Sequence, residues 1–562
     1  MKHAVRTAAL AIALAGPAAV MADGVSGPFL AGQAALENND LEAIAWYFTR
    51  VVTNDPLNGE AIENTMVGRI GTGDVKTSVA LARRLEALSP DNSIAAMVLA
   101  ADLAARGDWA ELADRIETSP GSAGGPLVDG LAAAWAQAGQ GNMQAALEGF
   151  DKVAGSEPLG DFGRFHKSLA LSMVGDLEGA EAIISENDLP QTKHTTLAHA
   201  MALAGLDRQD DALAVLDAYL TLDGSPDVQD LRNRIASGEA VPAALVATPT
   251  EGMAEAFYGV GRALLGEADD MFVLLYARLS QHLTPSSADA ILLSASVLEE
   301  MEQYELATQA YDRISSDSPA YFAAELGRAE TMRLSGSEEA AVEVLTQLGE
   351  AYPDIPVVHA NLGDLLRRMQ RFDEASQAYD RALALFAGDE QGLWFYHYTR
   401  GITHEREDRW ELAEADFRKA LELNPDQPQV LNYLGYSYVE MQVNLDEALE
   451  MIEKAVELRP RDGYIADSLG WVYYRLGRYP EALNWMEKAV ELLPIDPIIN
   501  DHLGDVYWAV DREREARFQW NRAMSFEPEE EDADRIRRKL QVGLDVVLEE
   551  EGAPPLPIAN DG

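Results

Sequence analysis

Apolar residues recur at intervals of three and four along almost the whole chain, which is the spacing of one face of an α-helix. Near the C-terminus, for example, Ile536, Leu540, Leu544 and Val547 share one face of an expected helix. Alternation of apolar and polar residues, which is typical of half-buried strands, is not convincing in any segment. The pattern therefore predicts an all-α chain.

A repeating motif organises the C-terminal half. Gly470 and Gly504 are 34 residues apart, and residues of the same kinds follow each of them at the same distances. The glycine column continues towards the N-terminus, in steps of 33 to 38 residues, through Gly435, Gly401, Gly363, Arg328, Ala295 and Gly261. A period of this length fits one pair of antiparallel helices per repeat. The longest step contains residues 386–390, which indicate a lengthened turn, and one extra residue is expected near 443–444.

Two further columns support the helix pairs. A proline follows the second helix of each repeat, where it stops the helix and fixes the path into the next repeat: Pro285, Pro319, Pro353, Pro425, Pro460, Pro494 and Pro528. A small residue occupies the position at which the paired helices are expected to touch: Ala307, Ala340, Ala375, Ala413, Ala448, Ala482 and Ala516. A bulky side chain in this column would push the helices apart.

These columns resemble the tetratricopeptide repeat, a family of helix–turn–helix repeats that stack into a right-handed α-solenoid. The resemblance implies this fold, and it implies binding of other proteins. A regular array is expected over residues 254–528, a degenerate array of about six repeats within 23–236, and a linker with Pro242, Pro249 and Gly252 over 237–253. Residues 529–551 are expected to form a capping helix, and 552–562 a disordered tail.

The first 22 residues have the features of a cleaved signal peptide. Lys2 and Arg6 give a positive start, an apolar run follows, and the small residues around 20–22 offer a cleavage site before Asp23. The apolar run is shorter than the roughly 20 residues that a membrane span needs, and no later segment is apolar enough for an integral membrane span. We therefore expect a periplasmic or secreted protein. It is not expected to be a lipoprotein, because the chain has no cysteine to carry a lipid.

Charge narrows the class of partner. The chain carries a formal net charge of −50 at pH 7, which opposes binding to nucleic acid and to anionic lipid. The same charge could attract a basic partner, or it could serve solubility or adaptation to a salty habitat. The sequence leaves these alternatives open.

The resemblance also indicates a binding surface. In tetratricopeptide proteins, the residues six and three before the glycine column and one and four after it line the concave groove. Carried over to this chain, the candidate protein-binding residues are Arg367, Phe395, Tyr398, Asn432, Tyr436, Tyr464, Asp467, Trp471, Tyr474, Asp501 and Trp508. Aromatic residues are favoured anchors at protein interfaces. The alternative is that some of these side chains pack between helices and bind nothing.

The sequence contains no pattern that predicts catalysis, a metal site or a cofactor. The pairs His194 with His199 and His397 with His404 lack the i, i+4 spacing of helical metal ligands, and a Gly-x-Ser-x-Gly nucleophile motif is absent. Leader, repeats, cap and tail account for nearly the whole chain, so we expect a protein that is not an enzyme. A hydrolase or transferase fused to repeats would need a further domain, which we do not find in the sequence.

Residues 431–548 carry a more specific resemblance, in Leu434-Gly435-Tyr436, in residues 467–478 and in residues 502–508. They are similar to tetratricopeptide proteins of the bacterial envelope, which include an outer-membrane lipoprotein that presents substrates to a periplasmic C-terminal-processing protease. The resemblance implies a periplasmic scaffold or adaptor for protein partners. A glycan-directed factor in polysaccharide assembly or cell-wall binding is the alternative, since exposed aromatic rings stack on sugars as well as on peptides.

Overall fold

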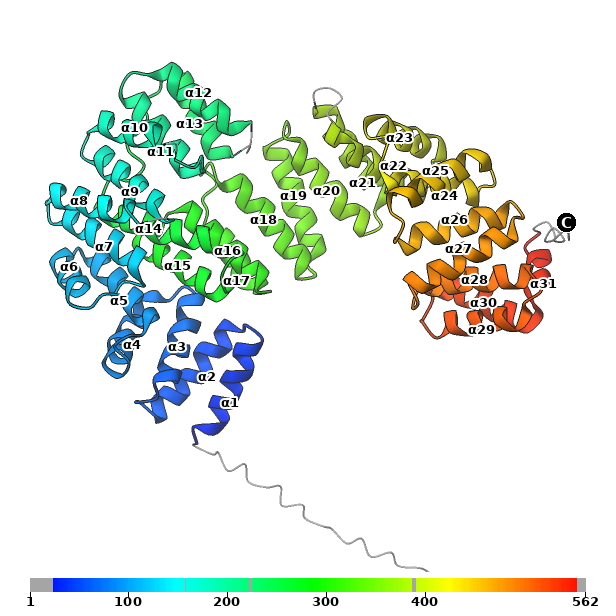
Figure 1. The fold of residues 1–562 in the computed structure, drawn as a ribbon, viewed down its shortest axis with the longest axis horizontal. Helices are drawn as coiled ribbons and strands as arrows, with labels where there is room; N and C mark the ends of the chain where they lie inside the picture. The colour runs from blue at the N-terminus through cyan, green and yellow to red at the C-terminus, as the bar shows by residue number, and fades with distance from the viewer. Residues whose placement is uncertain (1–23, 157, 188, 222–224, 387–390, 553–562) are drawn as a thin grey trace, which may run out of the picture. The chain divides into compact units, whose positions relative to one another are not determined.

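The computed structural model describes residues 24–156, 158–187, 189–221, 225–386 and 391–552 (Figure 1). These residues form α-helices and one 3-10 helix, and none of them forms a strand. The expected all-α class and the helix-pair repeat are thus confirmed. The expected leader and residues 553–562 of the expected tail lie outside the described residues.

The helices group into two compact units, Met1–Val344 and Leu345–Gly562, and the division falls within α19 (Glu338–Ala351). The first unit begins with six helix pairs and a single helix: α1 Ser26–Glu37, α2 Leu41–Asn54, α3 Gly59–Gly71, α4 Val75–Leu88, α5 Ser93–Arg106, α6 Trp109–Thr118, α7 Pro126–Gly139, α8 Met143–Ala154, α9 Gly160–Met173, α10 Leu177–Glu186, α11 Lys193–Gly205, α12 Gln209–Leu220 and α13 Pro226–Ala236. It continues with α14 Pro249–Leu264, α15 Asp270–Leu283, α16 Ala288–Glu300, α17 Tyr304–Tyr311 and α18 Tyr321–Leu334.

The second unit continues the helix pairs to the C-terminal cap. Its helices are α20 Pro356–Arg368, α21 Phe372–Leu385, η1 Gln391–Leu393, α22 Trp394–Arg406, α23 Trp410–Leu423, α24 Pro428–Glu440, α25 Leu445–Leu458, α26 Gly463–Arg475, α27 Tyr479–Leu492, α28 Pro497–Ala509, α29 Glu513–Met524, α30 Glu530–Val542 and α31 Leu544–Glu550. Each first helix packs on the second helix of its own repeat, and consecutive repeats share one hydrophobic core.

The turn inside each repeat has a recurring conformation. One residue, seven positions after the glycine column, adopts a left-handed backbone with φ between 56° and 73°: Glu302, Gln370, Asp408, Gln442, Gly477 and Asp511. A left-handed residue just after a helix lets the chain reverse while its amide bonds the last carbonyls of that helix. The extra residue expected near 443–444 is present as Asn444, which is left-handed as well and precedes α25.

The glycine column has a steric reason. A Cβ added to Gly470 would lie 2.8 Å from Met486, and one added to Gly504 would lie 2.4 Å from the ring of Trp520. Gly363, Gly401 and Gly435 face large side chains of their second helices in the same way. Most of the alanine column is fully buried, as expected, but Ala340 is exposed and Ala341 is buried in its place. The turn before α19 is one residue longer, which moves the register by one position.

The first unit does not divide at the expected linker, residues 237–253. Instead, α14 begins inside this segment, at Pro249, and returns to pack on α5, α7 and α9, while α15 packs on α3, α4 and α5. Arg278 of α15 is buried and its Nε donates to the carbonyl oxygen of Gly71 in α3, at 3.1 Å. One hydrophobic core therefore runs from Ala35 to Ala307, and these helices fill the inner side of the N-terminal repeats.

The expected capping helix over residues 529–551 consists of two helices, α30 and α31. They are separated at Gly543, which has φ +87° and lies against the ring of Trp508. Ile536, Leu544 and Val547 are buried against the last repeat, as their spacing predicts. Within the described residues, every helix is too short or too polar to cross a membrane.

Candidate functional site

The candidate binding surface is the inner wall of the second unit, which we define as the exposed side of the first helices α20, α22, α24, α26 and α28. Neighbouring first helices contact one another along this series, α22 and α24 through the rings of Tyr398 and Tyr433. Consequently, a side chain on one helix is either open to solvent or covered by the next repeat. The candidate residues fall into both groups.

The wall is open at α20 and α22. Phe395 is 41% exposed, and its ring lies edge-on to the neighbouring ring of Trp394, at 5.8 Å. Arg367 is half-buried, and its guanidinium is held by the Tyr379 hydroxyl at 3.3 Å and by the Asp364 carboxylate at 3.4 Å. These contacts fix the Arg367 side chain without satisfying all five of its donors.

Tyr398 lies one turn after Phe395 on α22 and packs against the core. Its ring is edge-on to Tyr433, with 5.9 Å between centroids, and tilted against Phe417 at 6.1 Å. It therefore supports the wall more than it exposes a free aromatic face. A packing role for some of the candidate aromatics, the alternative left open by the sequence, holds for this residue.

Asn432 of α24 has a side-chain oxygen that the fold leaves unbonded. Its Oδ1 is buried and has no hydrogen-bond partner in the part of the chain that the structure describes. Buried polar atoms of native proteins are nearly always bonded, so an exception of this kind is informative. An asparagine amide offers a donor and an acceptor side by side, which matches the backbone of an extended peptide.

Tyr436 lies one turn after Asn432 and is half-buried. Burial raises the pKa of its hydroxyl, and the nearby carboxylates of Glu440 and Asp467 raise it further. Tyr436 therefore remains a neutral hydrogen-bonding group under all ordinary conditions. Together with Asn432 it forms the polar part of the open wall.

Trp471 and Tyr474 of α26 are buried, with 7% and 6% of their surface exposed. The Trp471 ring is stacked between Tyr474, at 4.7 Å, and His502 of the next repeat, at 4.0 Å, and its Nε1 donates to Glu440 at 2.7 Å. The interpretation of these two residues as exposed anchors is therefore corrected. One ring face of Trp471 is covered by Tyr474 of the same helix, and the other by His502 of the following repeat.

Asp467 is buried for the same reason, and it accepts from Nδ1 of His502 at 3.0 Å. Burial alone would lower the pKa of His502, but the Asp467 carboxylate outweighs burial and raises it. Tyr464, at the start of α26, differs from its neighbours because it is 59% exposed. Of the candidates on α26, Tyr464 alone presents a large accessible surface.

The cap closes the wall at α28. Lys539 of α30 is fully buried, and its Nζ donates to Asp501 at 2.7 Å and to both oxygens of Asp505 at 2.7 Å. Burial raises the pKa of Asp501 in spite of this ammonium. Trp508 donates through Nε1 to Asp545 of α31 at 3.0 Å. Asp501 and Trp508 are thus engaged by the chain itself, which corrects their assignment to an open groove.

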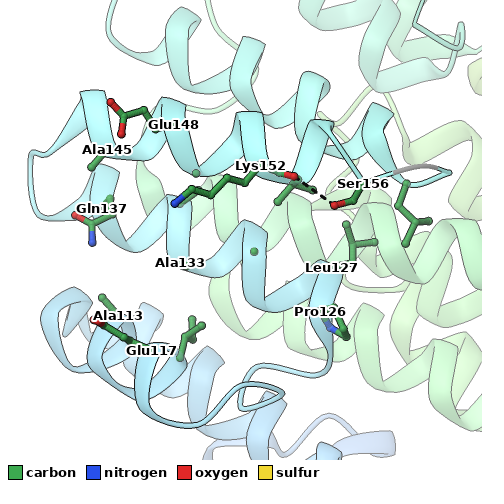
Figure 2. A pocket seen from close by; sticks show the side chains of 16 residues that line it. Ala113, Glu117, Pro126, Leu127, Ala133, Gln137, Ala145, Glu148, Lys152 and Ser156 are labelled. Carbon is green, nitrogen blue, oxygen red and sulfur yellow. Dashed lines mark hydrogen bonds between the residues drawn. The ribbon is translucent and has the colours of Figure 1, made fainter.

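The first unit contains a hollow of about 560 Å³ between α6, α7 and α8. Figure 2 shows the Lys152 side chain lying along it, between the labelled residues Gln137, Ala133 and Leu127. Alanine and glycine contribute six of its sixteen lining residues, and a Cβ added to Gly130 or Gly149 would meet the facing helix. The polar side chains of the lining are Glu117, Gln137, Glu148, Lys152 and Ser156.

The inner wall combines several kinds of side chain. It offers an aromatic side chain, a guanidinium, an unbonded amide and a phenol over three successive repeats. Among the described residues, histidine and carboxylate side chains form no cluster that could hold a metal ion. Sequence reasoning found the wall but missed how the next repeat and the cap cover its C-terminal half.

Comparison with known proteins agrees with this geometry. The tetratricopeptide repeat family matches residues 354–426 and 426–494. A TPR repeat-containing protein of Pseudomonas aeruginosa, PA4667, is 27% identical over 180 residues, which are 32% of this chain and 30% of that protein. The matched region thus spans about a third of the length of this curated relative.

Two solved structures are similar in fold. The APC/C hetero-tetramer Cut9–Hcn1 matches with 14% identity and a TM-score of 0.37, over 92% of this chain and 96% of that chain. A tetratricopeptide repeat protein from Parabacteroides merdae matches with 17% identity and a TM-score of 0.38, over 45% and 98%. The family match identifies residues 354–494, which carry most of the inner wall, as tetratricopeptide repeats, and the helix pairs described above agree with it.

Proposed function

We propose that this protein is a non-catalytic scaffold that binds protein partners through the open part of its inner wall, from α20 to α24. The observations that carry the proposal are the exposed ring of Phe395 on α22 and the half-buried polar side chains of Asn432 and Tyr436 on the next first helix, α24. An exposed aromatic ring provides apolar contact to a bound peptide, and amide and phenol groups bond its backbone. The enclosed Oδ1 of Asn432, which has no partner among the described residues, gains one if its surroundings rearrange on binding.

The sequence adds the compartment and a class of partner to this proposal. The signal peptide expected at residues 1–22 supports a periplasmic scaffold or adaptor, and cleavage predicts a mature chain that begins at Asp23. The resemblance of residues 431–548 supports a C-terminal-processing protease and its substrates as partners in the cell envelope. Intact mass of protein recovered from the periplasm tests the cleavage site directly.

Site-specific photo-cross-linking tests the binding surface. A photoreactive phenylalanine replaces Phe395 in the full chain, and the matched control carries it at Phe518, which is 64% exposed on the second helix α29. We expect discrete protein adducts from position 395 that disappear in an Asn432→Ala background. Equal adducts from both positions would contradict the proposal.

The glycan-directed alternative needs aromatic faces that are free to stack on sugars. The largest ring of the wall, Trp471, has both faces covered by Tyr474 and His502, which favours protein over glycan. Sedimentation with purified cell wall separates the two functions, since a scaffold stays in the supernatant without its protein partner.

A further inference from the structure

A cavity of about 540 Å³ lies in the first unit, beside the returning helix α14. It is lined by residues of α9, of α11 and the segment before it, of α12 and of α14. Both α11 and α14 contact α9 (Figure 1). Its volume lies within the range of about 300–1,000 Å³ that is usual for pockets that bind small molecules.

His166 of α9 contributes an unused hydrogen-bond donor to this cavity. The side chain is 1% exposed, and its Nδ1 accepts from Nε1 of Trp135 at 3.1 Å. Indole is only a donor, so Nδ1 of the neutral ring carries no proton and Nε2 carries it. Burial lowers the pKa of His166 to about 3, so the ring is neutral at physiological pH. Nε2 has no acceptor among the described residues, and His166 lines the cavity.

The other buried polar groups around the cavity are already paired. Lys193 forms ion pairs with Asp227 and Asp289, and His194 is bonded to Glu255 at 2.7 Å and to Asp289 at 3.0 Å. The lining residue Asp161 accepts from Arg164 at 2.6 Å. These groups hold the walls in place and leave little net charge for a ligand.

Arg262 of α14 is different. It lines the cavity from an exposed position, and within the described ranges its guanidinium has neither a hydrogen bond nor an ion pair. On a chain with net charge −50, most arginines of the first unit have a carboxylate partner. The lining of the cavity thus holds two donors that the described residues leave without an acceptor: the buried Nε2–H group of His166 and the exposed, hydrated guanidinium of Arg262.

The rest of the cavity is apolar and partly aromatic. Phe162, Phe165 and Tyr258 line it, and Tyr258 is stacked on His194 with 4.6 Å between ring centroids. Gly259 keeps space open on the α14 side, since a Cβ added there would have Phe162 as its nearest neighbour, at 3.7 Å. A ligand therefore meets an apolar surface together with two donors.

We propose that this cavity binds a small organic carboxylate with an aromatic or branched apolar body. Arg262 and the Nε2–H of His166 bind the carboxylate, and Phe162, Phe165 and Tyr258 hold the apolar body. Guanidinium and imidazole donors match carboxylate oxygens, and a charge-assisted bond of this kind is stronger than a neutral one. This site lies in the first unit, and it does not depend on protein binding by the inner wall.

The test uses calorimetric titration of the full chain with 3-phenylpropanoate, its neutral amide 3-phenylpropanamide, and acetate. We expect saturable binding of 3-phenylpropanoate, with the amide and acetate at least about tenfold weaker, because each lacks one of the two recognised features. Arg262→Gln should weaken binding of 3-phenylpropanoate by about tenfold or more. The matched control is Arg232→Gln, which changes an arginine that lies outside the cavity and pairs with Asp217. This variant should bind 3-phenylpropanoate as tightly as the wild type does.

A second variant occupies the cavity without removing a polar group. Gly259→Leu has room at its Cβ, so the fold should persist by circular dichroism while binding of 3-phenylpropanoate is lost. The proposal is overturned if the wild-type chain shows no saturable binding of 3-phenylpropanoate up to millimolar concentration. It is also overturned if the amide binds as tightly as the acid, or if Gly259→Leu and the wild type bind equally.

Discussion

The buried ammonium of Lys539 offers a sharp test of how the cap closes the inner wall. Lys539→Met keeps a long unbranched side chain but leaves the carboxylates of Asp501 and Asp505 without the cation that they share at 2.7 Å. Removing one partner of a buried ion pair typically costs about 3–5 kcal/mol, because the remaining charge is buried without compensation. Arg535 lies 3.6 Å from Asp505 and partly compensates the charge of its carboxylate. We therefore expect a cost at the lower end of this range, about 3 kcal/mol.

Hydrogen exchange of the α30 amides, measured by mass spectrometry on the full chain, reports this local loss directly. A change of about 3 kcal/mol corresponds to roughly 150-fold faster exchange at pH 7. The control is Lys454→Met, which removes an exposed ion pair with Asp426; exposed pairs contribute about 0–1 kcal/mol, so exchange near α25 should change less than about fivefold.

The deficit of Lys539→Met should also depend on pH. Burial already raises the pKa of Asp501, and loss of the ammonium must raise it further. A carboxyl whose pKa is raised in the folded state stabilises the fold as it becomes protonated. The difference in stability between the variant and the wild type should therefore become smaller from pH 7 to pH 5. Exchange in α30 that is unchanged at pH 7, or a deficit that does not respond to pH, would refute the reasoning.

Three further outcomes are expected. Gly504→Ala should destabilise the last repeat by about 1–3 kcal/mol, because its Cβ would lie 2.4 Å from Trp520. Gly27→Ala, whose Cβ would have nothing within 4 Å, should leave stability unchanged. Denaturant titration measures the free energy of unfolding of each variant. Burial lowers the pKa of His166 to about 3, so the folded state loses about 3 kcal/mol of stability when the pH falls from above 6.5 to 4. Amide exchange in α9 should become faster by the corresponding factor. His166→Phe should remove this dependence on pH. Burial opposes protonation of His194, but its carboxylate partners outweigh burial and raise its pKa to about 10. The stabilisation of the fold by protonated His194 is therefore complete below pH 6.5 and falls by about 2 kcal/mol between pH 7 and pH 9. Amide exchange in α11 that stays constant over this interval would contradict the prediction.

The repeat architecture could be read from the sequence because it depends on local contacts. A glycine facing a large residue, a left-handed turn and a proline after the second helix all recur at fixed distances within one repeat. The exposed Ala340 shows the limit of this reasoning, since a single extra residue in one turn moves the register.

Exposure along the inner wall could not be predicted in the same way. Periodicity places Phe395, six residues before its glycine, and Trp471, one residue after its glycine, on the same face of their first helices. It does not tell which of the two side chains the next repeat covers. Trp471 is covered by His502, from the following repeat, and Asp501 by Lys539, which is 38 residues further along the chain. The return of α14 onto α7 and α9 likewise depends on contacts between distant segments, and the cavity beside it has no signature in sequence.

The most direct test of the scaffold is the affinity of a cross-linked partner, once purified, for the wild-type chain and two single variants. Asn432→Ala removes the half-buried amide of the open wall, and Phe518→Ala truncates an exposed ring on a second helix. The account predicts that Kd rises at least about fivefold for Asn432→Ala, as loss of one or two hydrogen bonds requires, and stays unchanged for Phe518→Ala. The account would be contradicted if Kd were unchanged for Asn432→Ala and raised for Phe518→Ala, because the partner would then bind outside the inner wall.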